Sequence, residues 1–191
     1  MKPKALQVIQ DEHVAVAAVL RSMLALLQRS RDERRPPPFD VLRAMLFYVD
    51  EFPERQHHPK ESELLFPRLR RACPELVPVI DQLDDDHRHG ETAIRELEHL
   101  MLAFEVMGES RRARFERALE GYVEGYLEHM ATEDGTVLPA ARAHLAEADW
   151  AELDAAFAAN RDPLTGHPAS EEYGDLFQRI VNRAPAPIGL A

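Results

Sequence analysis

The stretch FPERQHHPKESELLFP, residues 52–67, decides how the chain folds. It places two adjacent histidines, a proline and several acids inside a segment whose apolar residues recur at helical spacing. Proline removes a backbone donor from a helix, and ionisable side chains are costly in an apolar core unless they are paired or bind a metal. The stretch is therefore either an irregular helix end or part of a binding site, and the rest of the chain distinguishes the two.

Apolar residues recur at helical spacing along almost the whole chain, and strand-like alternation is essentially absent. Four long helical segments are predicted, from Leu6 to Leu27, from Phe39 to about Cys73, from Glu75 to Gly108 and from Ser110 to Ala140. Their connections are short or marked by proline, which makes sequential neighbours antiparallel. The predicted fold is all-α, an up-down-up-down antiparallel four-helix bundle with one or two additional C-terminal helices.

The C-terminal part of the chain predicts a smaller helical unit. DWAELDAAFAAN (149–160) and EEYGDLFQRIVNRA (171–184) each have helical spacing. We expect residues 1–145 to form the bundle and residues 146–183 to pack on it as an extension. The last eight residues, APAPIGLA (184–191), are expected to be a flexible tail.

Composition narrows the class of protein. The chain has 34 acidic and 23 basic residues, and its formal net charge of -11 argues against nucleic-acid or anionic membrane partners. Cys73 is the only cysteine, so no disulfide or cysteine-rich metal site can form within one chain. We expect a cytoplasmic protein, because the sequence has no signal-peptide pattern and no apolar run of membrane-spanning length. The oligomeric state is left open.

Histidine and glutamate occur on the apolar stripes of the predicted helices. The spacing HxxxE places both side chains on one helix face, although it is also the ordinary spacing of an exposed pair. A carboxylate on a core stripe is expensive unless it is paired or bound to metal. His89 and His99 fall off the stripes and are predicted to be exposed. The stripe residues, which are the candidate metal ligands, are His13, His57, Glu61, His87, His129 and Glu133.

The level of these residues along the bundle supports one shared site. In an antiparallel hairpin, residues equally far from the turn lie at the same height. His13 and His57 are each about 22 residues from a turn near Arg35. His87 and His129 are each about 21 residues from a turn near Gly108. The candidate ligands of all four helices therefore converge on one layer of the core.

Four imidazoles and two carboxylates exceed the four ligands of one tetrahedral zinc ion. They suit two metal ions, each held by two histidines, with Glu61 and Glu133 as bridges between them. Imidazole and carboxylate ligands of this kind suit iron, and also manganese or zinc. The predicted cofactor is thus a pair of iron ions, with manganese or zinc as the other possibilities.

The chain resembles the hemerythrin-like, HHE cation-binding family over roughly residues 5–145. The matching motifs are EH at 12–13, HHPKE at 57–61 followed by LLFP, DHRHG at 86–90, and HMATED at 129–134 followed by VLP. The resemblance implies a non-haem di-iron centre that binds dioxygen, nitric oxide or related small molecules. In its ligand set the chain is most similar to the di-iron proteins that repair iron–sulfur clusters after nitrosative or oxidative stress.

Several neighbouring residues leave alternatives open. Oxygen-carrying hemerythrins have an HxxxH pair on the third helix and an aspartate five residues after the fourth-helix histidine. This chain has Glu91 four residues after His87, and Asp134 five residues after His129. Asp134 or Glu91 could therefore replace or supplement Glu133 as a ligand. Tyr126 is either a hydrogen-bond donor beside the site or an ordinary core aromatic residue.

For the residues next to the candidate ligands, the sequence predicts only whether they are ligands and whether they are exposed. His58, about 100° around a regular helix from His57, is expected to lie outside the set of metal ligands, and Ser62 is not a ligand. Three acids are most simply exposed, although one of them could hold the outer N–H of a ligand histidine. These acids are Glu12, Glu63 and Asp86.

The predicted function is binding of dioxygen, nitric oxide or peroxide at the metal centre, in a stress response or in iron handling. Two alternatives remain. The same site could belong to an enzyme that consumes peroxide or oxidises ferrous iron. The bundle could instead be structural, held by zinc or by no metal, and act through partners. Metal content separates the third hypothesis from the first two.

Overall fold

The computed structural model of the chain describes residues 3–168, 171 and 173–189, and within these residues every regular element is helical. The predicted all-α class is confirmed. The remaining residues lie outside the description, including small parts of the predicted bundle, extension and tail. No helix in the described part is both long and apolar enough to cross a membrane.

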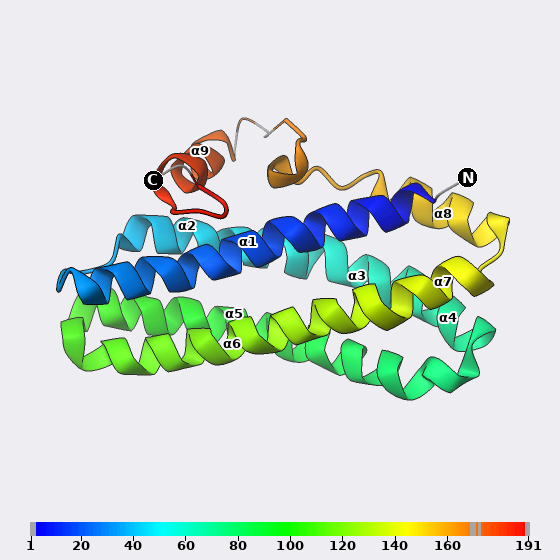
Figure 1. The fold of residues 1–191 in the computed structure, drawn as a ribbon, viewed down its shortest axis with the longest axis horizontal. Helices are drawn as coiled ribbons and strands as arrows, with labels where there is room; N and C mark the ends of the chain where they lie inside the picture. The colour runs from blue at the N-terminus through cyan, green and yellow to red at the C-terminus, as the bar shows by residue number, and fades with distance from the viewer. Residues whose placement is uncertain (1–2, 169–170, 172, 190–191) are drawn as a thin grey trace.

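Four helical stretches lie side by side and form the body of the molecule (Figure 1). The first is α1 (Lys4–Asp32), and the third is α5 (Val77–Met107). The second consists of α2 (Phe39–Val49), α3 (His58–Lys60) and α4 (Phe66–Ala72). The fourth consists of α6 (Arg112–Thr132) and α7 (Leu138–His144). Contacts join α1 to α2 and α6, and join α5 to the same two helices.

The second and fourth stretches contain wide, π-helical turns. These are η1 (Asp50–His57), η2 (Glu61–Leu65) and η5 (Glu133–Val137). Pro67 and Pro139 each stand six residues after a glutamate that begins such a turn. A proline has no N–H and its ring crowds the carbonyl four residues earlier, so a wider turn accommodates it. The second predicted helix is therefore not one regular helix, because its winding changes on both sides of Pro59.

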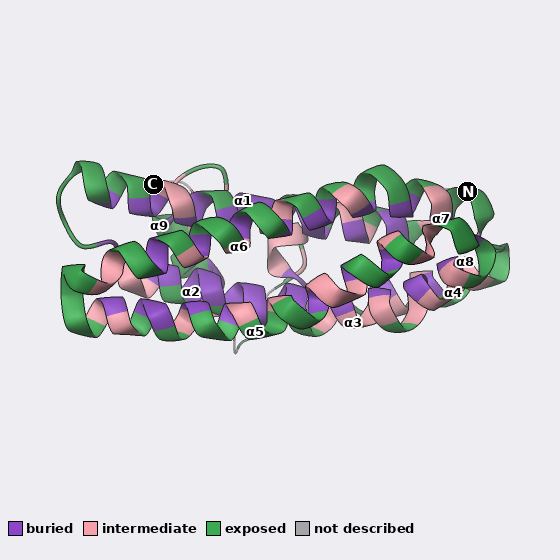
Figure 2. Cartoon of the chain, turned by 90° about the horizontal axis from the view of Figure 1, so that it is seen from below, coloured by how far each residue is buried: buried purple, intermediate pink, exposed green. Residues whose placement is uncertain are grey.

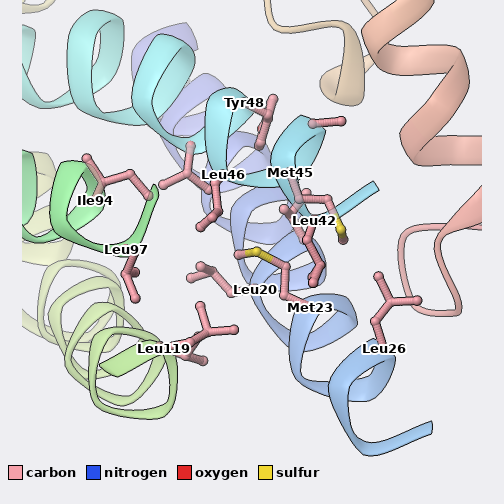
Figure 3. Close-up of a cluster of buried hydrophobic side chains, with 14 of the residues drawn as sticks. Leu20, Met23, Leu26, Leu42, Met45, Leu46, Tyr48, Ile94, Leu97 and Leu119 are labelled. Carbon is pink, nitrogen blue, oxygen red and sulfur yellow. The ribbon is translucent and has the colours of Figure 1, made fainter. Parts of the chain in front are cut away.

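The apolar core is divided into two clusters. The larger joins α1, α2, α5, α6 and α9, and Figure 3 shows Leu20, Leu42 and Leu97 within it. The smaller lies toward the other end of the bundle and includes Ile9 and Leu138. Buried residues face inward along the helices (Figure 2). Between the two clusters each stretch contributes polar residues, and this polar layer is where the candidate ligands lie.

The C-terminal extension contacts the bundle at two places. α8 (Glu147–Phe157) packs on α1 and joins the smaller cluster, whereas α9 (Gly174–Arg183) packs on α2 and joins the larger one. The short helix η6 (Pro163–Thr165) lies between them. In the segment predicted to be a flexible tail, the carbonyl of Pro185 accepts a hydrogen bond from Ser22 Oγ at 3.0 Å. Flexibility of that tail stays a prediction.

Candidate metal centre

All six candidate ligands are buried and meet in the layer between the two apolar clusters. α1 supplies His13, α5 supplies His87, and the second and fourth stretches supply one histidine and one glutamate each. Glu61 and Glu133 each begin a π-helical turn, η2 and η5. Their exposed fractions are 0% and 1%, so neither carboxylate is solvated by water.

Each of the two carboxylates reaches two histidines from different parts of the bundle. Glu133 Oε2 lies 3.3 Å from the Nε2 atoms of both His13 and His129. Glu61 Oε1 lies 3.2 Å from His57 Nε2, and its Oε2 lies 3.6 Å from His87 Nε2. Glu133 therefore connects a histidine of α1 with a histidine of α6, and Glu61 connects a histidine of η1 with a histidine of α5. A bridging ligand would make the same connections.

The four histidines share one orientation, with Nε2 toward the glutamates and Nδ1 toward an outer partner. An outer acceptor that holds a proton on Nδ1 leaves the Nε2 lone pair available for a metal. The outer partners, with their distances from Nδ1, are Asp134 for His13 (3.2 Å), Glu12 for His57 (2.6 Å), Ser62 for His87 (2.8 Å) and Asp86 for His129 (3.4 Å).

The inner atoms of the layer are not satisfied by the chain itself. Both carboxylate oxygens of Glu61, both of Glu133 and the Nε2 of His57 are buried without a hydrogen-bond partner. Nearly all buried polar groups in proteins form a hydrogen bond, whereas these carboxylates only have histidine nitrogens at 3.2–3.6 Å, in ion-pair contacts without one. Cations placed among these atoms would bind the carboxylate oxygens and the ring nitrogen and would balance the buried negative charge. The residues present therefore fit a metal centre.

The ligand atoms fall into groups of a size that suits metal ions. Atoms of His13, His57 and Glu61 lie within 4.8 Å of one another. A second group, of Glu61, His87, His129 and Glu133, meets the same limit. The two groups share Glu61 and therefore lie next to each other. Three or four nitrogen and oxygen ligands in each group are within the usual range for transition metals.

The two glutamates have opposite electrostatic environments. Burial raises the pKa of Glu61, and the nearby carboxylate of Glu133 raises it further. Burial also opposes the charged form of Glu133, but His129 and His13 outweigh that effect and hold the pKa of Glu133 well below its usual range. Glu133 is therefore the carboxylate that the histidines stabilise, whereas Glu61 is destabilised in the metal-free chain.

The two alternative carboxylates do not reach the inner nitrogens. Asp134 contacts the outer Nδ1 of His13, and its side chain is 42% exposed. Glu91 is exposed and forms an ion pair with Arg95 at 3.7 Å on the surface of α5. Glu133 is thus the fourth-stretch carboxylate that faces the other ligands.

His58 is buried against the polar layer that contains the candidate ligands. Its ring stacks on that of His87 with 4.0 Å between centroids and 12° between planes, and its nitrogens also lie near those of His87 and His129. Both of its nitrogens have other partners, because Nδ1 contacts Glu54 Oε2 at 3.1 Å and Nε2 contacts the hydroxyl of Tyr126 at 2.9 Å. Tyr126 is therefore hydrogen-bonded beside the site through His58.

Some residues of the site were missed or misplaced by sequence reasoning. Glu12 is buried rather than exposed, and it has the other role that the sequence left open for such an acid, since it holds the outer Nδ1 of His57; Asn160 donates to both of its carboxylate oxygens. Ser62 is not one of the inner ligands, as predicted, but its hydroxyl contacts the outer Nδ1 of His87, which the sequence did not indicate. Glu54 could have been found from its position four residues before His58, but nothing in the local sequence indicates Asn160.

A groove of about 710 Å³ runs between α5 and α6 and reaches the candidate ligands in the polar layer. Its inner end is lined by His58, His87 and His129. Small residues widen it, since Gly121 and Gly125 line the groove and have open space where a side chain would begin. A small molecule could therefore approach the second group of ligand atoms from the solvent.

A family model described as the hemerythrin HHE cation-binding domain matches residues 4–141. The match includes all six candidate ligands and ends before α8. No curated protein and no solved structure matches the chain.

Proposed function

Because the chain belongs to the hemerythrin HHE cation-binding domain family, we propose that it is a non-haem di-iron protein that binds dioxygen, nitric oxide or a related oxidant. The observation that carries the proposal is the set of buried carboxylate oxygens of Glu61 and Glu133 that have no hydrogen-bond partner in the chain. A role in oxidative or nitrosative stress, or in iron handling, is part of the same proposal. So is the likeness to proteins that repair iron–sulfur clusters.

In this proposal His13 and His57 would hold one ion, His87 and His129 would hold the other, and Glu61 and Glu133 would supply the carboxylate ligands. The outer partners of the four Nδ1 atoms orient the rings, so that little rearrangement is needed when metal binds. Bound iron would supply redox chemistry and a coordination position for a small oxidant. Manganese and zinc remain the other metals that suit these ligands.

The arrangement of the helices supports the predicted topology. α1 lies beside α2 and α6, and α5 lies beside the same two helices. We therefore include the up-down-up-down order of the four stretches in the proposal. The cytoplasmic location, and the absence of nucleic-acid and membrane partners, stay predictions from the sequence.

The proposal is tested by metal content and by the optical spectrum. We expect protein expressed in iron-replete medium, or loaded with ferrous iron without air, to hold about two iron ions per chain. Its spectrum is expected to change under air and under nitric oxide. His129→Ala is expected to lose iron, whereas His99→Ala, at an exposed histidine outside the site and the groove, is expected to keep it. Protein that cannot be loaded with iron would contradict the proposal.

The same preparation distinguishes a binding protein from an enzyme. Stable spectra with nitric oxide or oxygen, without turnover, are expected for a binding protein. Sustained loss of peroxide, abolished in Glu133→Ala, would instead indicate an enzyme.

Ligand access through the groove between α5 and α6 leads to a prediction about rates. Gly125→Leu places a side chain in the groove without a steric clash, and leucine favours the helix more than glycine does. We expect the variant to keep both metals and to bind nitric oxide about tenfold more slowly, within the range by which association rates vary among variants of one site. Stopped-flow mixing measures this rate. Glu124→Leu, which adds the same side chain outside the groove, should not change it.

Metal binding is expected to release protons at neutral pH. Burial lowers the pKa of His13, but Asp134 and Glu133 outweigh it and raise that pKa to about 9. A metal needs the unprotonated ring, so its apparent affinity should increase as the pH rises toward 9. Calorimetric titrations in two buffers with different ionisation enthalpies count the protons. Heats that do not depend on the buffer would contradict the prediction.

The same raised pKa has the opposite effect on the metal-free protein. A group whose pKa is higher in the folded chain stabilises the fold while it is protonated. The contribution of His13 is fully present below its ordinary pKa of 6.5 and is lost as the pH rises through about 9. The metal-free protein is therefore expected to be less stable at pH 10 than at pH 6, on the order of 3 kcal/mol at most for this group.

A further inference from the structure

The loop that follows α8 inserts one polar side chain beside the metal layer. Asn160 is 2% exposed, and its Nδ2 donates to both carboxylate oxygens of Glu12, at 2.9 and 3.0 Å. Its Oδ1 accepts a hydrogen bond from Nζ of Lys60, the residue before Glu61. An ammonium group can only donate and a carboxylate can only accept, so these two partners fix the orientation of the amide.

Glu12 transmits this contact to a candidate ligand. Glu12 Oε2 accepts from His57 Nδ1 at 2.6 Å, which is the shortest of the four contacts to an outer ring nitrogen. The proton held on Nδ1 leaves Nε2 of His57 toward Glu61, 3.2 Å away. Lys60, Asn160, Glu12 and His57 thus form one chain of contacts that ends at the inner face of the site.

The other carboxylates that hold ligand histidines are less constrained. The side chains of Asp134 and Asp86 are 42% and 38% exposed, whereas that of Glu12 is 7% exposed. Water can therefore replace Asp134 or Asp86 as the partner of its histidine, but it has little access to Glu12. His57 is the ligand whose orientation depends most on a protein contact from outside the bundle.

The extension is anchored on both sides of Asn160. On one side, Asp154 of α8 accepts a hydrogen bond from the backbone N–H of Ala5 at 2.7 Å, and Phe157 packs edge-on against the ring of His57 with 5.8 Å between centroids. On the other side, the buried hydroxyl of Tyr48 donates to Asp162 Oδ2 at 2.6 Å. The position of Asn160 is therefore determined by the fold rather than by a free loop.

We propose that Asn160 is a positioning residue of the metal centre, and that residues 146–162 are a functional part of the site although they lie outside the matched family domain. The inference rests on the proposed metal-binding function. Asn160 holds Glu12, Glu12 holds His57, and the ion bound by His13 and His57 depends on this contact. The ion bound by His87 and His129 does not.

The inference is tested with two substitutions of the amide. Asn160→Asp keeps the shape but removes the donors and faces the carboxylate of Glu12 with a second carboxylate. Asn160→Ala removes the contact altogether. Each is expected to weaken the binding of one of the two ions by about 10–100-fold, the usual effect of losing the partner of a ligand, and to leave the other ion in place. The optical spectrum and the reduction potential of the iron-loaded protein are expected to shift.

Ser22→Ala is the matched control, because it removes a hydrogen bond between the bundle and Pro185 without touching Glu12 or the loop that holds Asn160. It should leave both metal affinities and the spectrum unchanged. Lys60→Met, which removes the other partner of the amide, should give a smaller loss in the same direction as Asn160→Ala. This third substitution keeps the test open if a variant of Asn160 does not fold.

A measurement on the metal-free protein separates this inference from the proposed function. In denaturant unfolding of metal-free protein, Asn160→Ala and Glu12→Gln should show non-additive effects, whereas Asn160→Ala and Ser22→Ala should be additive. If the wild-type protein binds no metal, the proposed function fails whatever the result of this cycle. If the wild type binds two ions and the Asn160 variants bind them equally well, or if Ser22→Ala weakens binding as much, the inference is wrong.

Discussion

Removal of the metal ions by a chelator is expected to lower the melting temperature of the protein by about 15–30 °C. An ion present at 1,000 times its dissociation constant stabilises the folded state by about 4 kcal/mol, so two ions contribute about 8 kcal/mol. For a chain of this length, each kcal/mol corresponds to about 2–4 °C. The structural reason is that the buried oxygens of Glu61 and Glu133 form no hydrogen bond within the chain.

Scanning calorimetry of the same preparation before and after chelation measures this difference. His99→Ala, at an exposed histidine outside the site, should show the full loss on chelation. His87→Ala should already melt near the temperature of the chelated wild-type protein and should change little further. Equal melting temperatures for the loaded and chelated wild type would mean that metal does not stabilise this fold.

Replacing the two glutamates by leucine is expected to change the stability of the metal-free protein in opposite directions. Burial and the neighbouring Glu133 raise the pKa of Glu61, so its ionised form costs stability at neutral pH. Glu61→Leu should therefore stabilise the metal-free protein. Burial also disfavours the ionised form of Glu133, but His129 and His13 outweigh it, so Glu133→Leu should destabilise by about 3 kcal/mol.

Urea unfolding of the two metal-free variants at pH 7 measures both effects, and each variant serves as the control for the other. The difference between the free energies of unfolding of the two variants should shrink at low pH, where Glu61 is protonated in the wild-type protein and no longer costs stability. Both variants are expected to lose at least one metal ion. A change of the same sign in the two variants would show that the carboxylates are equivalent in the metal-free chain.

The six candidate ligands could be identified from the sequence because their positions follow from the helical repeat and from the number of residues that separates each of them from a turn. Helical spacing places His13, His87 and the HxxxE pairs on apolar stripes, and equal distances from the turns place them at one level. Both quantities depend only on regular helices and short connections. The structure brings these six side chains into contact, whereas their role as metal ligands remains a prediction that metal analysis must test.

The surroundings of the site could not be predicted in the same way. A wide π-helical turn ends at His57, and a wider turn separates successive side chains by a smaller angle than a regular helix does. His58 is therefore buried beside the layer. Asn160 reaches Glu12 from 148 residues away in the chain, through packing of the extension, and no local pattern records such a contact.

The division of the core into two clusters affects how the protein unfolds. α8 packs on the smaller cluster and α9 on the larger, and the polar layer lies between the clusters. In the metal-free protein the two clusters are joined across this layer by polar contacts rather than by apolar packing, so we expect each half to open with its own free energy. Metal bound by residues of all four stretches links the two halves. Metal occupancy then determines whether the molecule unfolds as one cooperative unit or as two.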